Sequence, residues 1–262
     1  MTKWLGILLM ACLSLATTVE AQTYPSKTVT IIVTAAAGGV TDIIARAIAQ
    51  RLSEKWGQNV IVENKGGGAH VVGAQQVANA APDGHTLMMA EAGTYLVNPN
   101  IYPKDKLPFD TEKDFIPITA TIRIHHSVMV APNLPVNSVA ELIELAKKKP
   151  GELTYGTAGI ASGPHVNVSR FENMAGIKLN PIHYRGASPA INDVMGGHTN
   201  MMMVSVGLAL PLHRQGKIKM LSIGSAKRLP QLAEFPTTAE SGNLPGYVAR
   251  SEERRVGKEC RL

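Results

Sequence analysis

Residues 29–68 read VTIIVTAAAGGVTDIIARAIAQRLSEKWGQNVIVENKGGG, which alternates between the pattern of a buried strand and that of an amphipathic helix. The β-branched run Val29–Val33 is typical of a buried strand. Apolar residues then recur at every fourth position through residues 41–55, which predicts a helix. A second β-branched run at residues 60–62 predicts another strand. This succession favours a parallel sheet with a helical crossover.

The same alternation continues along the chain and then starts again. Further strands are predicted at residues 86–90, 116–122, 127–130, 153–155, 181–184, 201–204 and 219–223. Further helices are predicted at residues 71–81, 139–149, 164–176 and 189–196, the second and the last of them capped by Ser138 and Ser188. We therefore expect an α/β protein of two lobes, the first formed by residues 22–122 and 226–249 and the second by residues 123–225.

The two ends of the chain differ in character from the body. Residues 1–21 combine Lys3 with a short apolar run and small residues before Gln22, the pattern of a secretory signal peptide. We therefore expect a soluble protein exported to the periplasm. Cys12 lies too early in the apolar run to favour lipidation. Cleavage would leave Cys260 as the one cysteine, so neither an intramolecular disulfide nor a cysteine zinc site is expected.

Residues 250–262 are unlike the rest of the sequence. Eight of these thirteen residues are charged, and they show no apolar periodicity. The segment is interpreted either as a solvated tail or as an aberrant end produced by a truncated or altered reading frame.

The composition excludes several classes of protein. Of the 262 residues, 45% are hydrophobic and 18% are charged, which is typical of a chain with a folded core. The net charge is +6, but residues 22–249 carry 20 basic and 16 acidic side chains that are mostly scattered. The basic run Lys147–Lys149 lies at a predicted helix end, where cations complement the helix dipole. We therefore expect no nucleic-acid partner.

Three segments share the order strand, small-residue loop and helix N-terminus: residues 34–42, 157–165 and 184–189. Ligands of open α/β sheets bind at the carboxyl ends of the strands, where helix N-termini present free N–H groups. Such loops can bind a carboxylate without an ion pair. Asp42, in the first turn of its helix, either stabilises the helix dipole or contacts an amino or hydroxyl group of a ligand.

Signals for catalysis are weak. Residues 159–163 read GIASG, which is not the G-x-S-x-G pattern of a nucleophile elbow. Ser162 is interpreted as a helix cap, with His165 facing a cleft or packing nearby; a serine hydrolase using both residues is the remote alternative. The histidines lack metal-ligand spacing, and neither a phosphate-binding loop nor a dinucleotide fingerprint is present in the sequence. We expect no catalytic residues, metal or cofactor.

Motifs spread over residues 24–247 resemble one family. They are PSKTVTIIV at 25–33, GGVTDIIAR at 38–46, VENKGGG at 62–68, APDGHTL at 81–87, Asn98-Pro99, YRG at 184–186, PA at 189–190 and PTTAESG at 236–242. With these motifs the chain resembles the substrate-binding receptors of the tripartite tricarboxylate transporter family, also called Bug receptors. The resemblance implies a two-lobed fold like that of type II periplasmic binding proteins, acting as a monomer.

The resemblance also implies a function. A small organic carboxylate binds between the lobes and is delivered to the membrane subunits of the transporter. A sensory receptor that signals to a membrane kinase is the alternative. The implied ligand-binding residues are Ala36, Ala37, Gly38, Gly39, Asp42, Gly93 and Thr94 of the first lobe and Thr157, Ala158, Gly159, Ser162, His165, Tyr184, Gly186, Ala187 and Ser205 of the second.

The chain departs from the family's pattern at three places. Ala37 stands where the family usually has proline, and Asn200 stands where it usually has aspartate before the methionine-rich residues 201–203. Beyond Tyr247 the family continues with helices and a strand that complete the first lobe, whereas this sequence continues with residues 250–262.

Overall fold

The computed structural model describes residues 23–91, 93–103 and 105–257. The signal peptide expected at residues 1–21, Cys12 within it, and Cys260 lie outside the described residues. None of the helices within the described ranges combines the length and the apolar character that crossing a membrane requires.

The first lobe is built on a parallel sheet, as the alternation of strands and helices predicts. Strand β1 (Val29–Val33) pairs in parallel with β2 (Val60–Asn64) on one side and with β3 (Thr86–Glu91) on the other. Helix α2 (Val40–Trp56) connects β1 to β2, and α3 (Val71–Ala78) leads towards β3. Both crossovers are therefore helical, which confirms this part of the prediction.

The two faces of this sheet pack into separate apolar clusters. Ile32 and Met88 point to the face that α3 covers, whereas Ile31, Val33 and Met89 point to the face that α2 covers. All five side chains are buried. The alternation follows from the pleat of a strand, whose successive side chains point to opposite faces.

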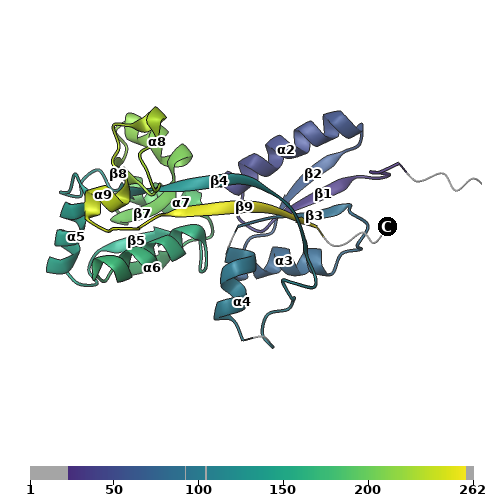
Figure 1. Ribbon diagram of the computed structural model, residues 1–262, viewed down its shortest axis with the longest axis horizontal. Helices are drawn as coiled ribbons and strands as arrows, with labels where there is room; N and C mark the ends of the chain where they lie inside the picture. Colours follow the sequence, from purple (N-terminus) through teal and green to yellow (C-terminus); the bar gives the residue numbers. More distant parts are fainter. Residues whose placement is uncertain (1–22, 92, 104, 258–262) are drawn as a thin grey trace, which may run out of the picture.

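Two long strands connect the first lobe to the second (Figure 1). Strand β4 (Ile116–Val130) runs through both sheets, and β9 (Arg250–Gly257) lies antiparallel between β3 and β4. The expectation of two strands at residues 116–122 and 127–130 is therefore wrong, because the residues between them continue the ladder. The backbone of residues 250–257 forms a strand, so the interpretation of this part as a solvated tail is wrong. The other interpretation, an altered reading frame, stays a prediction.

The second lobe contains a mixed sheet. Strand β5 (Thr154–Thr157) pairs in parallel with β6 (Asn180–His183) and with β7 (Met201–Ser205). The far half of β4 pairs antiparallel with β7 and with β8 (Lys219–Ile223). The helices of this lobe are α5 (Val139–Lys148), α6 (Gly163–Ala175), α7 (Ala187–Met195), α8 (Val206–Arg214) and α9 (Thr238–Gly242).

Helix ends follow the expected capping chemistry with one exception. Ser138 caps α5 by accepting a hydrogen bond from the backbone N–H of Glu141, as predicted. Helix α7 begins at Ala187 with Gly186 as its N-cap, so the prediction of Ser188 as the cap is wrong. The remaining short elements are η1 (Gly68–His70), η2 (Gly93–Val97), α4 (Asn98–Ile101) and η3 (Pro230–Leu232).

The core of the second lobe is rich in methionine. Met129 of β4 and Met201–Met203 of β7 are fully buried. Phe235, Leu244 and Tyr247 belong to the same apolar cluster. Residues 226–249 were expected in the first lobe, but these side chains pack on the second, since β8 leads directly into them.

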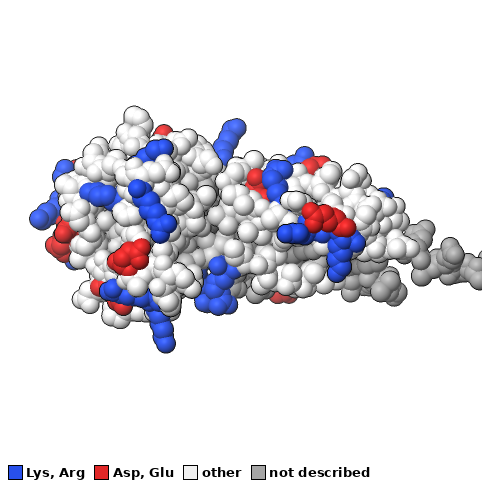
Figure 2. Space-filling model, turned by 90° about the horizontal axis from the view of Figure 1, so that it is seen from above, with Lys and Arg blue, Asp and Glu red and all other residues white. Residues whose placement is uncertain are grey.

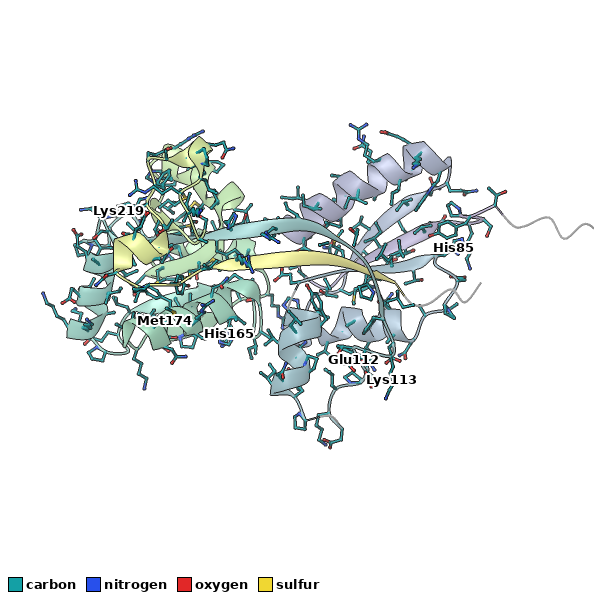
Figure 3. All side chains as sticks on the ribbon, viewed as in Figure 1. His85, Glu112, Lys113, His165, Met174 and Lys219 are labelled. Atoms are coloured by element: carbon teal, nitrogen blue, oxygen red, sulfur yellow. The ribbon has the colours of Figure 1, made fainter. Side chains whose placement is uncertain are left out.

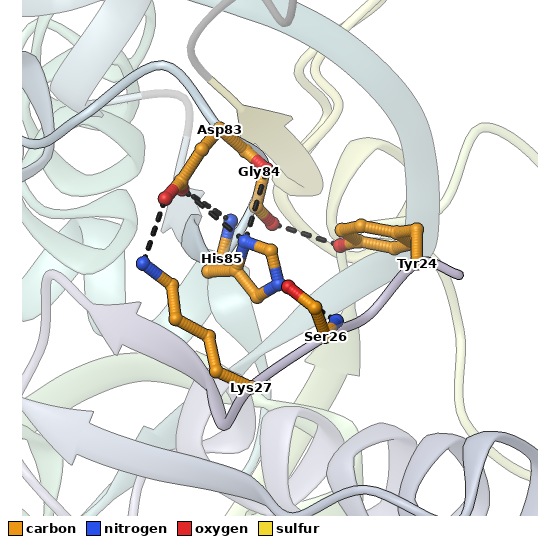
Figure 4. A network of polar contacts seen from close by, with 6 residues as sticks. All are labelled: Tyr24, Ser26, Lys27, Asp83, Gly84 and His85. Atoms are coloured by element: carbon orange, nitrogen blue, oxygen red, sulfur yellow. Dashed lines mark hydrogen bonds and ion pairs between the residues drawn. The ribbon is translucent and has the colours of Figure 1, made fainter. Parts of the chain in front are cut away.

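Charged side chains of both signs are interspersed over both lobes on the face that Figure 2 shows. The beginning of the described chain is held to the first lobe, at the end where Figure 3 places His85. There Tyr24 Oη donates a hydrogen bond to the Gly84 carbonyl, 2.8 Å away, and the Lys27 ammonium lies 2.9 Å from the Asp83 carboxylate. Figure 4 shows this network. It fixes residues 24–27 beside the turn that precedes β3.

Candidate functional site

A cleft of about 300 Å³ lies between the two lobes. Its lining comes from the loop after β1, the glycine loop after β2, the loop after β5 and the loop before α7. A second cavity of about 50 Å³ shares part of this lining, so the two form one interlobe cleft. The shared residues are Ala35, Ala36, His70, Ala158 and Gly186. The cleft is thus at the carboxyl ends of parallel strands, where α/β proteins bind ligands.

Two helix N-termini from opposite lobes meet in this cleft. The N-cap residues of α2 and α7 are Gly39 and Gly186, and both line it. A Cβ atom built on Gly186 would lie 2.7 Å from the Ala36 Cβ, and one built on Gly38 would lie 3.2 Å from the Ser188 hydroxyl. The lobes therefore touch at these two glycines. Their positive φ angles, 116° for Gly186 and 80° for Gly38, also favour glycine. The first N–H groups of both helices have no partner within their own helix.

A third helix N-terminus in the cleft already holds a carboxylate. The backbone N–H of Gly163, the first residue of α6, donates to Glu91 Oε2 over 3.4 Å. Thr41 Oγ1 donates to Glu91 Oε1 over 3.2 Å. Glu91 ends β3 of the first lobe, so this contact links the two lobes. It illustrates how a helix N-terminus accommodates an anion without a cationic side chain.

Ser162 and His165 have structural partners. Ser162 is the N-cap of α6, as predicted, and its hydroxyl donates to the Gly159 carbonyl over 2.7 Å. His165 Nδ1 accepts from the Ala161 N–H over 3.2 Å rather than from Ser162. Burial, together with nearby His183, lowers the pKa of His165. Figure 3 labels His165 near the start of α6. The pair is arranged as a helix cap and a loop support.

Asp42 shapes the loop after β1. Its Oδ2 accepts from the Gly38 N–H over 3.0 Å, and its Oδ1 lies 3.0 Å from Arg46 Nη2. Burial raises the pKa of this carboxyl, but the hydrogen bonds from Gly38 and Arg46 outweigh burial and leave the pKa below its ordinary value. Asp42 therefore stays ionised and holds the loop closed on the start of α2. Contact of Asp42 with a ligand stays a prediction.

The structure brings most of the predicted loop residues to the cleft. Those that line it are Ala36, Ala37, Gly39, Ala158, Gly159, Tyr184, Gly186, Ala187 and Ser205. The other predicted residues lie behind or beside this lining: Gly38, Asp42, Gly93, Thr94, Thr157, Ser162 and His165. Their contact with a ligand, like that of the lining residues, stays a prediction.

The predicted site residues left out four lining residues with ionisable side chains: His70, Glu91, His126 and Arg185. Arg185 is exposed and lies in the loop before α7, within a motif that was recognised without weighing its charge. Glu91 directly follows the strand predicted at residues 86–90 and is the last residue of β3. His70 follows the recognised glycine loop, and both it and Ala69 have positive φ angles, of 72° and 54°. Alanine and histidine seldom adopt this left-handed conformation, so the sequence does not predict it.

His126 lies deeper in the cleft. It is 5% exposed, and its Nδ1 accepts a hydrogen bond from the Asn167 amide nitrogen over 2.9 Å. Burial lowers the pKa of His126 to about 4. The side chain is therefore neutral at physiological pH. Within the ranges described, no three His, Cys, Asp or Glu side chains are grouped as metal ligands.

Comparisons with known proteins agree with this geometry. Residues 44–251 match the model of the tripartite tricarboxylate transporter family receptor. The protein BugT of Bordetella pertussis is 31% identical over 252 residues, covering 95% of this chain and 76% of that protein.

Two solved structures have the same fold. A protein of R. palustris solved with adipate has a TM-score of 0.86 and 33% identity, covering 91% of this chain and 79% of that one. MatC of Rhodopseudomonas palustris, solved with bound malate, has a TM-score of 0.84 and 27% identity, covering 91% and 80%. The resemblance inferred from the motifs is confirmed, as is the two-lobed α/β fold of a periplasmic binding protein. The chain belongs to the receptor family of the tripartite tricarboxylate transporters.

Proposed function

We propose that this protein is an extracytoplasmic solute receptor that binds a small carboxylate between its lobes and delivers it to a tripartite tricarboxylate transporter. The observation that carries the proposal is the meeting of the α2 and α7 N-termini, from opposite lobes, at one cleft lined by small residues. Their N–H groups and partial positive charge favour an anion there. Arg185 adds a cationic side chain to the same lining.

The likeness to proteins solved with adipate and with malate supports a carboxylate as the ligand. The contact of Gly163 N–H with Glu91 supports the same chemistry, because another N-terminus of the cleft holds a carboxylate within the protein itself. Export is proposed from the signal-peptide pattern of residues 1–21.

Calorimetric titration with mono-, di- and tricarboxylates tests the binding step. We expect saturable 1:1 binding of at least one carboxylate and no binding of its neutral diamide, since the cleft would select the negative charge. The variant Ala36→Asp should abolish binding, because it places a carboxylate beside Gly186 in the cleft. Ala47→Asp is the matched control, with the same change of charge on an exposed position of α2. Absence of binding across the panel would refute the proposal.

The delivery step needs a separate experiment. The ligand-loaded receptor is expected to co-purify with the membrane subunits of a tripartite tricarboxylate transporter and not with the ectodomain of a sensor kinase. Capture by the kinase ectodomain alone would replace transport with sensing.

A further inference from the structure

The imidazole of His70 is held in one orientation at the cleft. His70 Nδ1 lies 2.8 Å from the carbonyl oxygen of Thr34. A carbonyl oxygen can only accept, so Nδ1 carries the hydrogen. With a single ring hydrogen, which Nδ1 carries, Nε2 presents a lone pair. His70 lines both cavities of the cleft.

Nε2 of His70 lacks the partner that a buried polar atom normally has. The residue is 6% exposed, and Nε2 is buried with no hydrogen-bond partner among the residues that the structure describes. A buried acceptor left unpaired is costly, so such an atom calls for an explanation. A ligand in the cleft that donates a hydrogen bond to Nε2 would supply one.

The backbone around His70 costs energy to maintain. The positive φ angles of Ala69 and His70 place two consecutive residues with side chains in a region that favours glycine. The ring also packs close to Gly93, where a built Cβ would lie 3.4 Å from His70 Cδ2. A side chain held at this cost, in a residue that lines the cleft and has an unpaired ring nitrogen, is typical of a functional position.

Two kinds of polar group in the cleft bear on the choice of ligand. The N-termini of α2 and α7 offer N–H donors, which suit a carboxylate. The Glu91 carboxylate and the lone pair of His70 Nε2 are acceptors in the same lining. Each oxygen of Glu91 accepts one hydrogen bond within the protein and retains capacity for another. A ligand that satisfies both kinds has a carboxylate and a separate hydrogen-bond donor.

We infer that His70 is a specificity-determining residue that selects carboxylates bearing a hydroxyl or ammonium substituent over the unsubstituted acids. This inference rests on the proposed function, because it assigns the substrate class of the same cleft. A hydrogen-bond donor on the ligand would pair with Nε2 and raise the affinity, whereas an unsubstituted acid would leave Nε2 buried without a partner.

Paired ligands test the inference. Malate and succinate differ by one hydroxyl, citrate and tricarballylate differ in the same way, and aspartate replaces the hydroxyl of malate with an ammonium group. In calorimetric titrations of the whole protein we expect the substituted member of a pair to bind about tenfold tighter, the factor expected for one buried hydrogen bond.

The variant His70→Gly should bring the affinities of a pair to within about threefold, and glycine suits the positive φ at this position. His198→Gly is the matched control, because His198 is exposed and outside the cleft lining, and it should keep the wild-type ratio. The ratio is the decisive quantity, since a general loss of structure would weaken both members alike.

Equal affinity for both members of every pair, or a ratio that His70→Gly leaves unchanged, would overturn the assignment of His70 while leaving carboxylate binding intact. If no carboxylate of either kind binds, the proposed function itself fails and this inference fails with it.

Discussion

Acidification from pH 8 to pH 5 should destabilise the protein through His126. The pKa of this imidazole is about 4 in the folded protein because burial disfavours the charged ring. In the unfolded chain the ordinary value of 6.5 applies. Between these values the unfolded state binds more protons, so stability falls as the pH falls through 6.5, and the loss is complete below 4. At pH 5 this amounts to about 2 kcal/mol of unfolding free energy.

Urea denaturation at the two pH values measures this loss, and His126→Gln isolates it. Other histidines with lowered pKa values, His125 and His165, contribute with the same sign in both proteins. The pKa of Asp83 is lowered to about 2 by its contacts with Lys27 and His85. The stability that the ionised carboxylate contributes is therefore lost only at pH values below 5, outside the measured range. The variant should lose roughly 2 kcal/mol less than wild type between pH 8 and pH 5.

The decisive quantity is the change in unfolding free energy between pH 8 and pH 5, not the stability at either pH. The variant also loses the hydrogen bond to Asn167 and is therefore less stable at both pH values. His198→Gln, which changes an exposed histidine, should keep the wild-type slope. If wild type and His126→Gln lose the same free energy on acidification, His126 is not held neutral by burial and the reasoning is wrong.

Two further substitutions have definite expected outcomes. Gly93→Ala places a Cβ onto the Ala161 carbonyl oxygen of the opposite lobe, so calorimetric titration should show the ligand affinity reduced about tenfold or more. Gly207→Ala is the control, because its new Cβ would make only an ordinary van der Waals contact. Unchanged affinity in Gly93→Ala would mean that this contact is not part of the binding-competent form. Thr237→Ala removes the capping box that Thr237 forms with Glu240 at α9, so the unfolding free energy measured by urea denaturation should fall by about 1 kcal/mol. Thr119→Ala, at an exposed position, is the control and should change the unfolding free energy little. Equal effects of the two substitutions would contradict the capping role.

Local patterns predicted the parts of the fold that depend on local chemistry. The β-branched run at residues 29–33 forms β1, and Ser138 and Ser162 cap their helices as expected. Strand β4 was predicted in two pieces because Arg123, His125 and His126 interrupt its apolar pattern. Its continuity comes from β9 and β7, partners far away in the sequence, which a local pattern does not reveal.

The loops of the candidate site were predicted, as were Tyr184 and Ser205 among its polar side chains, but its lining histidines, glutamate and arginine were not. Small residues before helix starts led to Ala36, Gly39 and Gly186, all of which line the cleft. His70 could not be found in this way, because its position depends on a backbone conformation that histidine rarely adopts and on a hydrogen bond to Thr34. Helix α8 was also missed, since Gly207 and Pro211 obscure its pattern.

The methionines at the centre of the second lobe have a chemical consequence. Met129 and Met201–Met203 are fully buried, so a peroxide molecule reaches their sulfur atoms only when the lobe opens. Conversion of a thioether to a sulfoxide makes it polar, and such a group fits poorly into a packed apolar interior. Each oxidation event therefore hinders refolding, and the rate at which sulfoxides accumulate records how often this lobe unfolds.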